Sequence, residues 1–235
     1  FAPDITGFSI RNLDSQDMEK PESPLPEIRG FVEVAKRAGA KVLLGGTAFS
    51  TLPREMLDYM GGDYGICGQG ESGITDLVAG IAEGNVSPTI PGLVWREGDE
   101  IQANEPNTPG FGQSRPDWKR MRRSNPINAL WPCCVVTKTG CPNGCLYCDS
   151  AHLMGRKSKP REPEAIVDDF ETIIADTGQR VFHLADPGFN SDLDWAKRVL
   201  EAMIRRKLRV CLNTVMVPMR GRFDDELFSL YRRAG

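Results

Sequence analysis

The chain has 235 residues, with 29 Lys and Arg against 32 Asp and Glu, a formal net charge of -3 and 40% hydrophobic residues. These ordinary globular values argue against a disordered chain and against a strongly basic nucleic-acid binder. No apolar run is long enough to predict a transmembrane helix, and the N-terminus lacks the pattern of a secretory signal. Seven cysteines are too few for a disulfide scaffold, so we expect reduced thiols in a cytoplasmic protein of one or two domains.

The first hundred residues alternate short apolar runs with amphipathic segments. Strands and the helices between them are expected in turn at 4–10, 26–38, 41–44, 52–60, 63–67 and 71–82. The expected strands are continuous apolar runs, which is typical of a parallel sheet covered by helices on both faces. A small hairpin is expected around Glu97-Gly98-Asp99. This part of the chain is therefore predicted to be an α/β domain over residues 1–103.

Residues 104–132 lack this alternation of strands and helices and are interpreted as a linker between domains. The segment is rich in proline and holds a basic cluster at 119–123. We interpret the cluster as a solvated face, with an anionic ligand as the alternative. Trp118, Leu130 and Trp131 require burial, so the linker is expected to be irregular but packed.

A second alternating pattern occupies the rest of the chain. Its strands and helices are expected in turn at 133–139, 163–176, 180–184, 191–206, 208–214 and 223–234. Ser191 is expected to cap the N-terminus of its helix. Cys133, Cys134 and Cys211 are expected to be small buried apolar groups. His183 is interpreted as a core residue of an inner strand rather than a catalytic base.

Three cysteines carry the strongest chemical signal. Cys141, Cys145 and Cys148 form a CxxxCxxC run directly after a predicted strand, and Pro142 and Gly144 let the loop fold back so that the thiolates converge. Thiolates are the usual ligands of iron–sulfur clusters. Three ligands leave one iron of a four-iron cluster without a protein donor, and an open position of this kind distinguishes reactive metal sites from closed ones.

Two other interpretations of the cysteine loop remain open. A zinc site could be completed by His152, Cys133 or Cys134, although the paired CxxC spacing of structural zinc modules is absent. Three cysteines without any metal would fit poorly with a loop rich in proline, glycine and asparagine.

Cys141, Cys145 and Cys148, with Tyr147 before the last of them, resemble the signature of the radical S-adenosylmethionine (radical SAM) enzymes. The resemblance implies that residues 133–235 are the first part of a partial (β/α)6 barrel. It also implies a [4Fe-4S] cluster whose open iron chelates S-adenosylmethionine. An electron from the cluster would cleave S-adenosylmethionine and produce a 5′-deoxyadenosyl radical that abstracts hydrogen. Tyr147 would then pack near the adenine, with simple loop packing as the alternative.

The same resemblance implies contacts to S-adenosylmethionine after the next two strands. The family places a Gly-Gly-Glu-type segment after the second barrel strand, where this chain has Ala185, Asp186 and Pro187. The backbone there would receive the methionine amino group, and Asp186 could accept from it. Asn213 and Thr214, at the end of the third strand, stand where ribose or carboxylate contacts are expected, since barrel ligands gather at the carboxyl ends of strands.

The first domain resembles the Rossmann-like, flavodoxin-like cobalamin-binding fold, because glycines and polar residues follow each of its strands. Such glycines let a ligand approach the backbone at the carboxyl edge of a sheet, although a packing or turn role is the alternative. The Asp-x-His-x-x-Gly motif of many cobalamin proteins is absent. The residues that the resemblance implies in cobalamin binding are Ser9, Arg11, Gly45, Gly46, Thr47, Gly68, Gln69, Gly70 and Glu71.

The chain is expected to be a fragment, with the front of the cobalamin domain and the rear of the barrel missing. Its expected organisation is a cobalamin-binding domain at 1–103, a linker at 104–132 and the first half of the barrel at 133–235.

Together these features predict a cobalamin-dependent radical SAM enzyme, first of all a methyltransferase acting on a carbon centre. A cyclase or rearrangement enzyme with the same cofactors and a zinc-stabilised binding module are the alternatives. A methylthiotransferase is disfavoured because Cys67 is the only cysteine before the linker. The expected partners are a small-molecule or lipid-like substrate and an electron donor such as flavodoxin or ferredoxin, with no nucleic acid.

Overall fold

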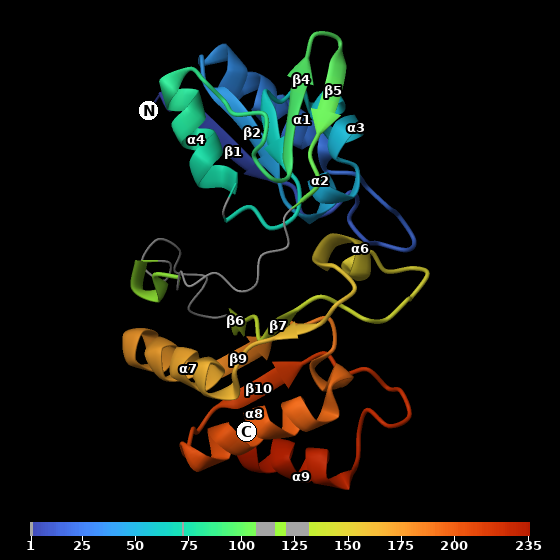
Figure 1. The fold of residues 1–235 in the computed structure, drawn as a ribbon, viewed down its shortest axis with the longest axis vertical. Coiled ribbons are helices and arrows are strands. Elements are labelled where there is room, and N and C mark those ends of the chain that lie inside the picture. The colour runs from blue at the N-terminus through green and yellow to red at the C-terminus, as the bar shows by residue number, and fades with distance from the viewer. Residues whose placement is uncertain (1, 72, 107–115, 121–131) are drawn as a thin grey trace. The chain divides into compact units, whose positions relative to one another are not determined.

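The computed structural model describes residues 2–71, 73–106, 116–120 and 132–235. The chain forms two compact units, each with its own sheet (Figure 1). Unit 1 comprises residues 1–109 with 152–154, and unit 2 comprises the remainder. In the described residues, no helix is long and apolar enough to cross a membrane.

Unit 1 is built on a five-stranded sheet in the order β1-β2-β3-β4-β5 (Figure 1). The strands β1 (Ile5–Ser9), β2 (Lys41–Gly45) and β3 (Tyr64–Ile66) are parallel, as expected from the sequence. The expected hairpin is also present, as β4 (Leu93–Glu97) and β5 (Glu100–Ala103). It extends the sheet, because β4 pairs antiparallel with β3.

Helices follow each parallel strand of unit 1. They are α1 (Leu25–Arg37), α2 (Thr47–Thr51), α3 (Pro53–Met60) and α4 (Gly73–Glu83). The short helix α2 was not expected from the sequence. Helices α1 and α3 begin with proline in the first turn, where its missing N–H costs nothing. Helix α1 buries Val32 but leaves Phe31 and Val34 more than half exposed.

The sheet of unit 1 buries both of its faces. Along β2, Val42 and Leu44 pack in one hydrophobic cluster, with residues of α1, α2 and α3. Leu43, between them, points to the opposite face and packs in a second cluster with Leu77 of α4. Because successive side chains of a strand alternate between faces, this continuous apolar run requires cover on both sides. The expectation drawn from the continuous runs is confirmed.

Unit 2 contains a three-stranded parallel sheet in the order β10-β9-β6. Its strands are β6 (Cys133–Val135), β9 (Val181–Leu184) and β10 (Cys211–Thr214). The single strand expected at 133–139 is divided, because β7 (Lys138–Thr139) leaves this sheet and pairs antiparallel with β8 (Lys159–Pro160). A short helix that was not expected, α6 (Ser150–Met154), follows the cysteines, and its residues 152–154 are grouped with unit 1.

The helices of unit 2 are α7 (Pro163–Thr177), α8 (Leu193–Arg205) and α9 (Asp225–Ala234). The expectation that Ser191 caps α8 is wrong by one residue. Asp192 is the N-cap, and its carboxylate accepts a hydrogen bond from the backbone N–H of Trp195 at 3.0 Å. A carboxylate at this position also offsets the positive end of the helix dipole. Ser191 instead ends a 3-10 turn at Phe189–Ser191.

One face of the unit 2 sheet carries the core of that unit. Phe182 and Leu184 of β9 are fully buried against α7 and α8, and the Phe170 ring lies 4.6 Å from that of Phe182 in an edge-to-face arrangement. Cys133 and Leu212, on either side of Phe182, pack against the same cluster.

The opposite face of this sheet presents a row of polar side chains. Cys134, His183 and Asn213 are paired across the three strands, and Cys134 and Asn213 are exposed while His183 is half-buried. Cys211, two residues before Asn213, is also exposed. The expectation that Cys134 and Cys211 are buried is therefore wrong, because strand alternation turns them away from the face that the helices cover.

Part of the expected linker packs on unit 2. Trp118 contacts the core of this unit, and the Lys119 ammonium lies 3.0 Å from the Asp176 carboxylate. Residues 121–131, which include most of the basic cluster, Leu130 and Trp131, lie outside the described residues.

Gly65 gives a test of the packing of unit 1. A Cβ atom at this position in β3 would lie 2.2 and 2.7 Å from atoms of the fully buried Phe49 ring. We expect Gly65→Ala to lower the free energy of unfolding by about 1–3 kcal/mol, the usual cost of overpacking a core. The measurement is urea denaturation followed by circular dichroism. Gly7→Ala is the control, because a Cβ in β1 meets nothing within 4 Å; equal stability of the two variants would contradict the prediction.

Candidate functional site

Unit 1 has a cavity of about 440 Å³ at the carboxyl ends of its parallel strands. Its walls come from the last residues of β1 and β2, the end of β3 and the turn that leads into α4. A volume of this size is typical of small-molecule sites. The carboxyl edge of an open α/β sheet is also where such folds bind ligands.

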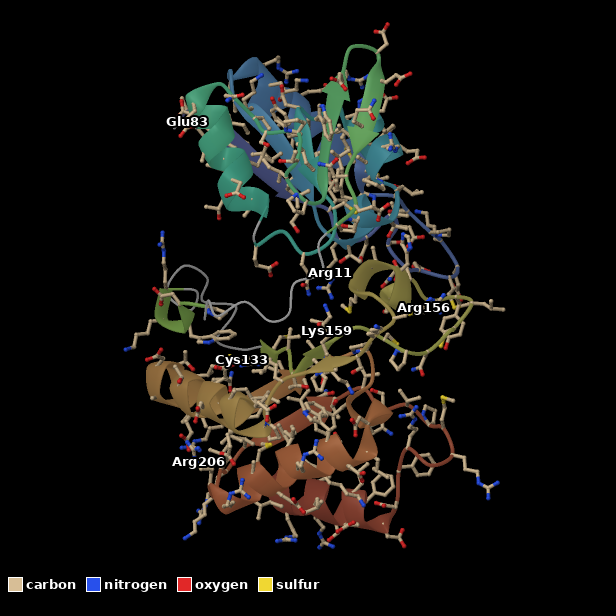
Figure 2. The ribbon with its side chains drawn as sticks, in the orientation of Figure 1. Arg11, Glu83, Cys133, Arg156, Lys159 and Arg206 are labelled. Atoms are coloured by element: carbon tan, nitrogen blue, oxygen red, sulfur yellow. The ribbon has the colours of Figure 1, made fainter. Side chains whose placement is uncertain are left out.

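Most residues expected to contact cobalamin line this cavity. Those that do are Ser9, Gly45, Gly46, Gly68, Gly70 and Glu71. Those that do not are Arg11, Thr47 and Gln69. Arg11 follows β1 and is exposed to solvent (Figure 2).

Gly46 shapes one wall of the cavity. Its backbone has φ of 95°, and a Cβ atom would lie 2.5 Å from the carbonyl oxygen of Ile10. That carbonyl accepts a hydrogen bond from the N–H of Ala48 at 3.0 Å, while the N–H of Ile10 donates to Gly45 at 2.7 Å. The chain after β1 and the chain after β2 approach this closely only because residue 46 has no side chain.

The cysteine loop of unit 2 is fixed at its start. The N–H of Cys141 donates to the Gly155 carbonyl at 2.9 Å, and its side chain is buried. Cys145 and Cys148 are exposed and connected by a hydrogen bond from the N–H of Cys148 to the Cys145 carbonyl at 3.3 Å. Tyr147, between them, is 93% exposed and does not pack within the loop.

The three sulfurs are not gathered into a metal-binding group. In the described part of the chain, no group of three or more His, Cys, Asp or Glu side chains is arranged to hold a metal ion. The donor set nevertheless fits an iron–sulfur cluster. Its three thiols are free and share one loop, with Cys141 anchored and Cys145 and Cys148 accessible to incoming iron.

Asp186 ties the loop after β9 to the segment before the cysteines. Its carboxylate accepts hydrogen bonds from the N–H of Thr137 at 2.9 Å and of Lys138 at 3.2 Å, and from the Thr137 hydroxyl. The side chain is buried. These bonds give both carboxylate oxygens a protein donor, and it stays a prediction that Asp186 could also accept from the methionine amino group.

The other predicted contacts to S-adenosylmethionine lie at the carboxyl ends of the same strands. Ala185 follows β9 and donates its N–H to the Val135 carbonyl at 3.0 Å. Pro187 follows Asp186 in this loop, and Asn213 and Thr214 end β10. Asn213 is exposed on the open face of the sheet.

Lys138 is a buried residue that the sequence analysis missed. Its ammonium donates to the Phe189 carbonyl at 2.8 Å and to the Ser191 hydroxyl at 2.6 Å. Burial lowers its pKa to about 8, against the attraction of Asp186, Asp192 and Cys141. The sequence signal that could have identified this residue is a lysine inside an expected strand, shortly before the cysteines.

Comparison with known proteins agrees with these features. Residues 135–235 match the radical SAM superfamily. The chain is 25% identical to a tryptophan 2-C-methyltransferase of Streptomyces laurentii, over 99% of this chain and 48% of that protein. It is 28% identical to an anaerobic magnesium-protoporphyrin IX monomethyl ester cyclase of Cereibacter sphaeroides, over 74% of this chain and 30% of the cyclase.

Solved structures give the same picture of the fold. The radical S-adenosylmethionine methyltransferase TsrM of Kitasatospora setae, solved with tryptophan and a SAM analogue, matches with a TM-score of 0.83 at 26% identity, over all of this chain and 47% of TsrM. The cobalamin-dependent radical enzyme OxsB matches with a TM-score of 0.71 at 16% identity, over 99% of this chain and 34% of OxsB. The chain thus spans about half, or less, of the length of these relatives. Residues 135–235 thus match the radical SAM superfamily, and the whole chain is similar in sequence to a tryptophan 2-C-methyltransferase and in fold to TsrM.

Proposed function

We propose that this chain is part of a cobalamin-dependent radical SAM methyltransferase that methylates a carbon centre of a small molecule. Cys141, Cys145 and Cys148 would hold a [4Fe-4S] cluster, and the cavity of unit 1 would hold cobalamin. The observation that carries the proposal is the free CxxxCxxC loop that follows β6 and β7 in unit 2. Its position within the radical SAM match supports this assignment.

The cavity of unit 1 supports the second cofactor. Part of its wall is glycine or serine, contributed by Gly7 and Ser9 in β1, Gly45 and Gly46 at the end of β2, and Gly68 and Gly70 after β3. Such a wall lets a long, flat-sided ligand approach the main chain closely. TsrM was solved with cobalamin and a [4Fe-4S] cluster, and OxsB with aqua-cobalamin and S-adenosylmethionine.

When bound, these cofactors supply the electron that cleaves S-adenosylmethionine and the methyl group that is transferred. The residues of the chain would bind these cofactors and orient them. Asp186 holds the backbone that enters the cysteine loop, so that its start stays fixed against the loop after β9. The backbone of Ala185 to Pro187, together with Tyr147 and Asn213, would then contact S-adenosylmethionine at the carboxyl edge of the sheet.

The substrate is proposed to be a small molecule, and the electron to come from a protein such as flavodoxin or ferredoxin. The similarity to the magnesium-protoporphyrin ester cyclase favours ring formation as a second candidate reaction with the same cofactors. Supplying S-adenosylmethionine with a labelled methyl group separates the two, because only methyl transfer moves the label into product.

Anaerobic reconstitution tests the cluster. We expect the wild-type chain to become brown and bind about four iron and four sulfide per chain. Cys145→Ala and Cys148→Ala should lose most of this iron, because each removes one of the three ligands. Cys134→Ala and Cys211→Ala are the controls, since both exposed thiols lie outside the loop, and they should retain the iron. A colourless protein with one bound zinc would contradict the proposal.

A bulky side chain at Gly45 tests the cobalamin cavity. A Cβ atom at Gly45 has only the Ile66 carbonyl within 4 Å, at 3.6 Å, so a larger residue fits the fold but projects into the ligand space. We expect Gly45→Leu to weaken hydroxocobalamin binding at least about tenfold, corresponding to ~1.4 kcal/mol. The measurement is equilibrium dialysis followed by visible absorbance. Gly30→Leu, on the exposed side of α1, should bind like wild type; equal affinity of the two variants would place cobalamin elsewhere.

A further inference from the structure

Lys138 carries a buried positive charge. Its side chain is 1% exposed and, among the residues that the structure describes, no other lysine or arginine is classed as buried. The ammonium donates to the Phe189 carbonyl and the Ser191 hydroxyl, and it lies 5.0 Å from the centroid of the Trp195 ring. Two of the three N–H donors of the ammonium are thus hydrogen-bonded to protein oxygens, and the face of an aromatic ring lies close to the charge.

All of these partners are electrically neutral. Within the described ranges, Lys138 forms no ion pair with a carboxylate. The nearby Asp186 accepts from the backbone of Thr137 and Lys138 instead, and Asp192 accepts from the N–H of Trp195. A buried charge without an ion pair is costly, and burial accordingly lowers the pKa of the group.

The cysteine loop is the place where negative charge would accumulate near this ammonium. Lys138 precedes Cys141 by three residues, so their Cα atoms are at most about 11 Å apart. Electrostatic attraction to Cys141 favours the ammonium form of Lys138. Lys138 and Cys141 are both buried, so the electric field between them is screened less than it would be in water.

We propose that Lys138 is a positioning residue that acts through its charge, raising the reduction potential of the cluster held by Cys141, Cys145 and Cys148. This inference rests on the proposed function. Reduction adds one electron, and so one negative charge, to the cluster, and it makes or breaks no bond at Lys138. The electron comes from a low-potential donor of the flavodoxin or ferredoxin class. A fixed positive charge stabilises the reduced form more than the oxidised form, and net charge is one of the factors that set cluster potentials.

The buried hydrogen bonds of Lys138 distinguish this role from ligand binding. The ammonium is buried in the turn ahead of α8, where it donates to the Phe189 carbonyl and the Ser191 hydroxyl instead of facing solvent. It can therefore influence the cluster only through its electric field and through the backbone that it helps to fix.

Two substitutions change the net charge at the Lys138–Ser191 hydrogen bond, one at the donor and one at the acceptor. Lys138→Met removes the ammonium and keeps an unbranched chain, and Ser191→Asp keeps the lysine but places a carboxylate against it. Ser191→Asn is the matched control, because it has the shape of aspartate without the charge. Reconstituted whole-chain proteins are titrated anaerobically with dithionite, and the midpoint potential is read by electron paramagnetic resonance.

We expect Lys138→Met and Ser191→Asp each to lower the reduced-to-oxidised ratio about tenfold at a fixed applied potential, a shift of ~59 mV for a one-electron couple. Ser191→Asn should stay near the wild-type potential. Circular dichroism and iron content show which variants remain folded and loaded. If Lys138→Met does not fold, the comparison of Ser191→Asp with Ser191→Asn still decides the outcome.

Loaded variants with the wild-type potential would overturn this inference and leave the proposed function intact. The same holds if Ser191→Asn shifts as far as Ser191→Asp, since packing and not charge would then set the potential. A wild-type chain that binds no four-iron cluster would overturn both.

Discussion

The Asp186 carboxylate connects two segments that are far apart in the sequence, and the geometry of the cysteine loop depends on it. By accepting from consecutive backbone N–H groups at residues 137 and 138, it fixes the point at which the chain leaves β6 and turns toward Cys141. Hydrogen bonds to a charged acceptor are stronger than neutral ones, particularly when buried. The loop after β10 is joined in the same way, because Asn190 donates to the carbonyls of Val217 and Arg222 and accepts from the N–H of Val217.

These ties follow from the parallel topology of the sheet. Parallel strands end at the same edge, so the segments after β6, β9 and β10 meet there although the chain needs a helix to travel from each strand to the next. Polar side chains buried at this edge hold the segments together, while the apolar face of the sheet beneath them packs on α7 and α8. The edge thus combines a rigid base with a cysteine loop whose outer part, at Cys145 and Cys148, remains exposed.

Sequence patterns predicted the regular elements well and the side-chain environments less well. The helix at 163–176 has a long apolar repeat and was found within one residue, as α7. The strand expected at 133–139 is divided in the structure. A hydropathy pattern does not show that the backbone N–H groups of Thr137 and Lys138 donate to Asp186 instead of pairing with a neighbouring strand. Burial of Cys134 and Cys211 was misjudged, since a hydrophobicity scale does not tell which face of a strand the helices cover.

The same limit applies to the candidate sites. The cysteine spacing and the glycines after strands are local signals, and they led to the loop and to the glycines of the cavity wall that follow β2 and β3. The roles of Lys138 and Asp186 depend on contacts across about fifty residues of chain. Such contacts follow from how the strands are ordered and from which side chains find partners, and neither is encoded in a short motif.

The two units have separate hydrophobic cores, one built around Phe182 and Trp195 and the other around Phe49 and Leu57. A defect inside one core therefore removes packing energy from that unit alone, and heat or denaturant can melt the halves in succession. A single melting temperature would then average two events, so the tolerance of the chain to mutation has to be judged one unit at a time.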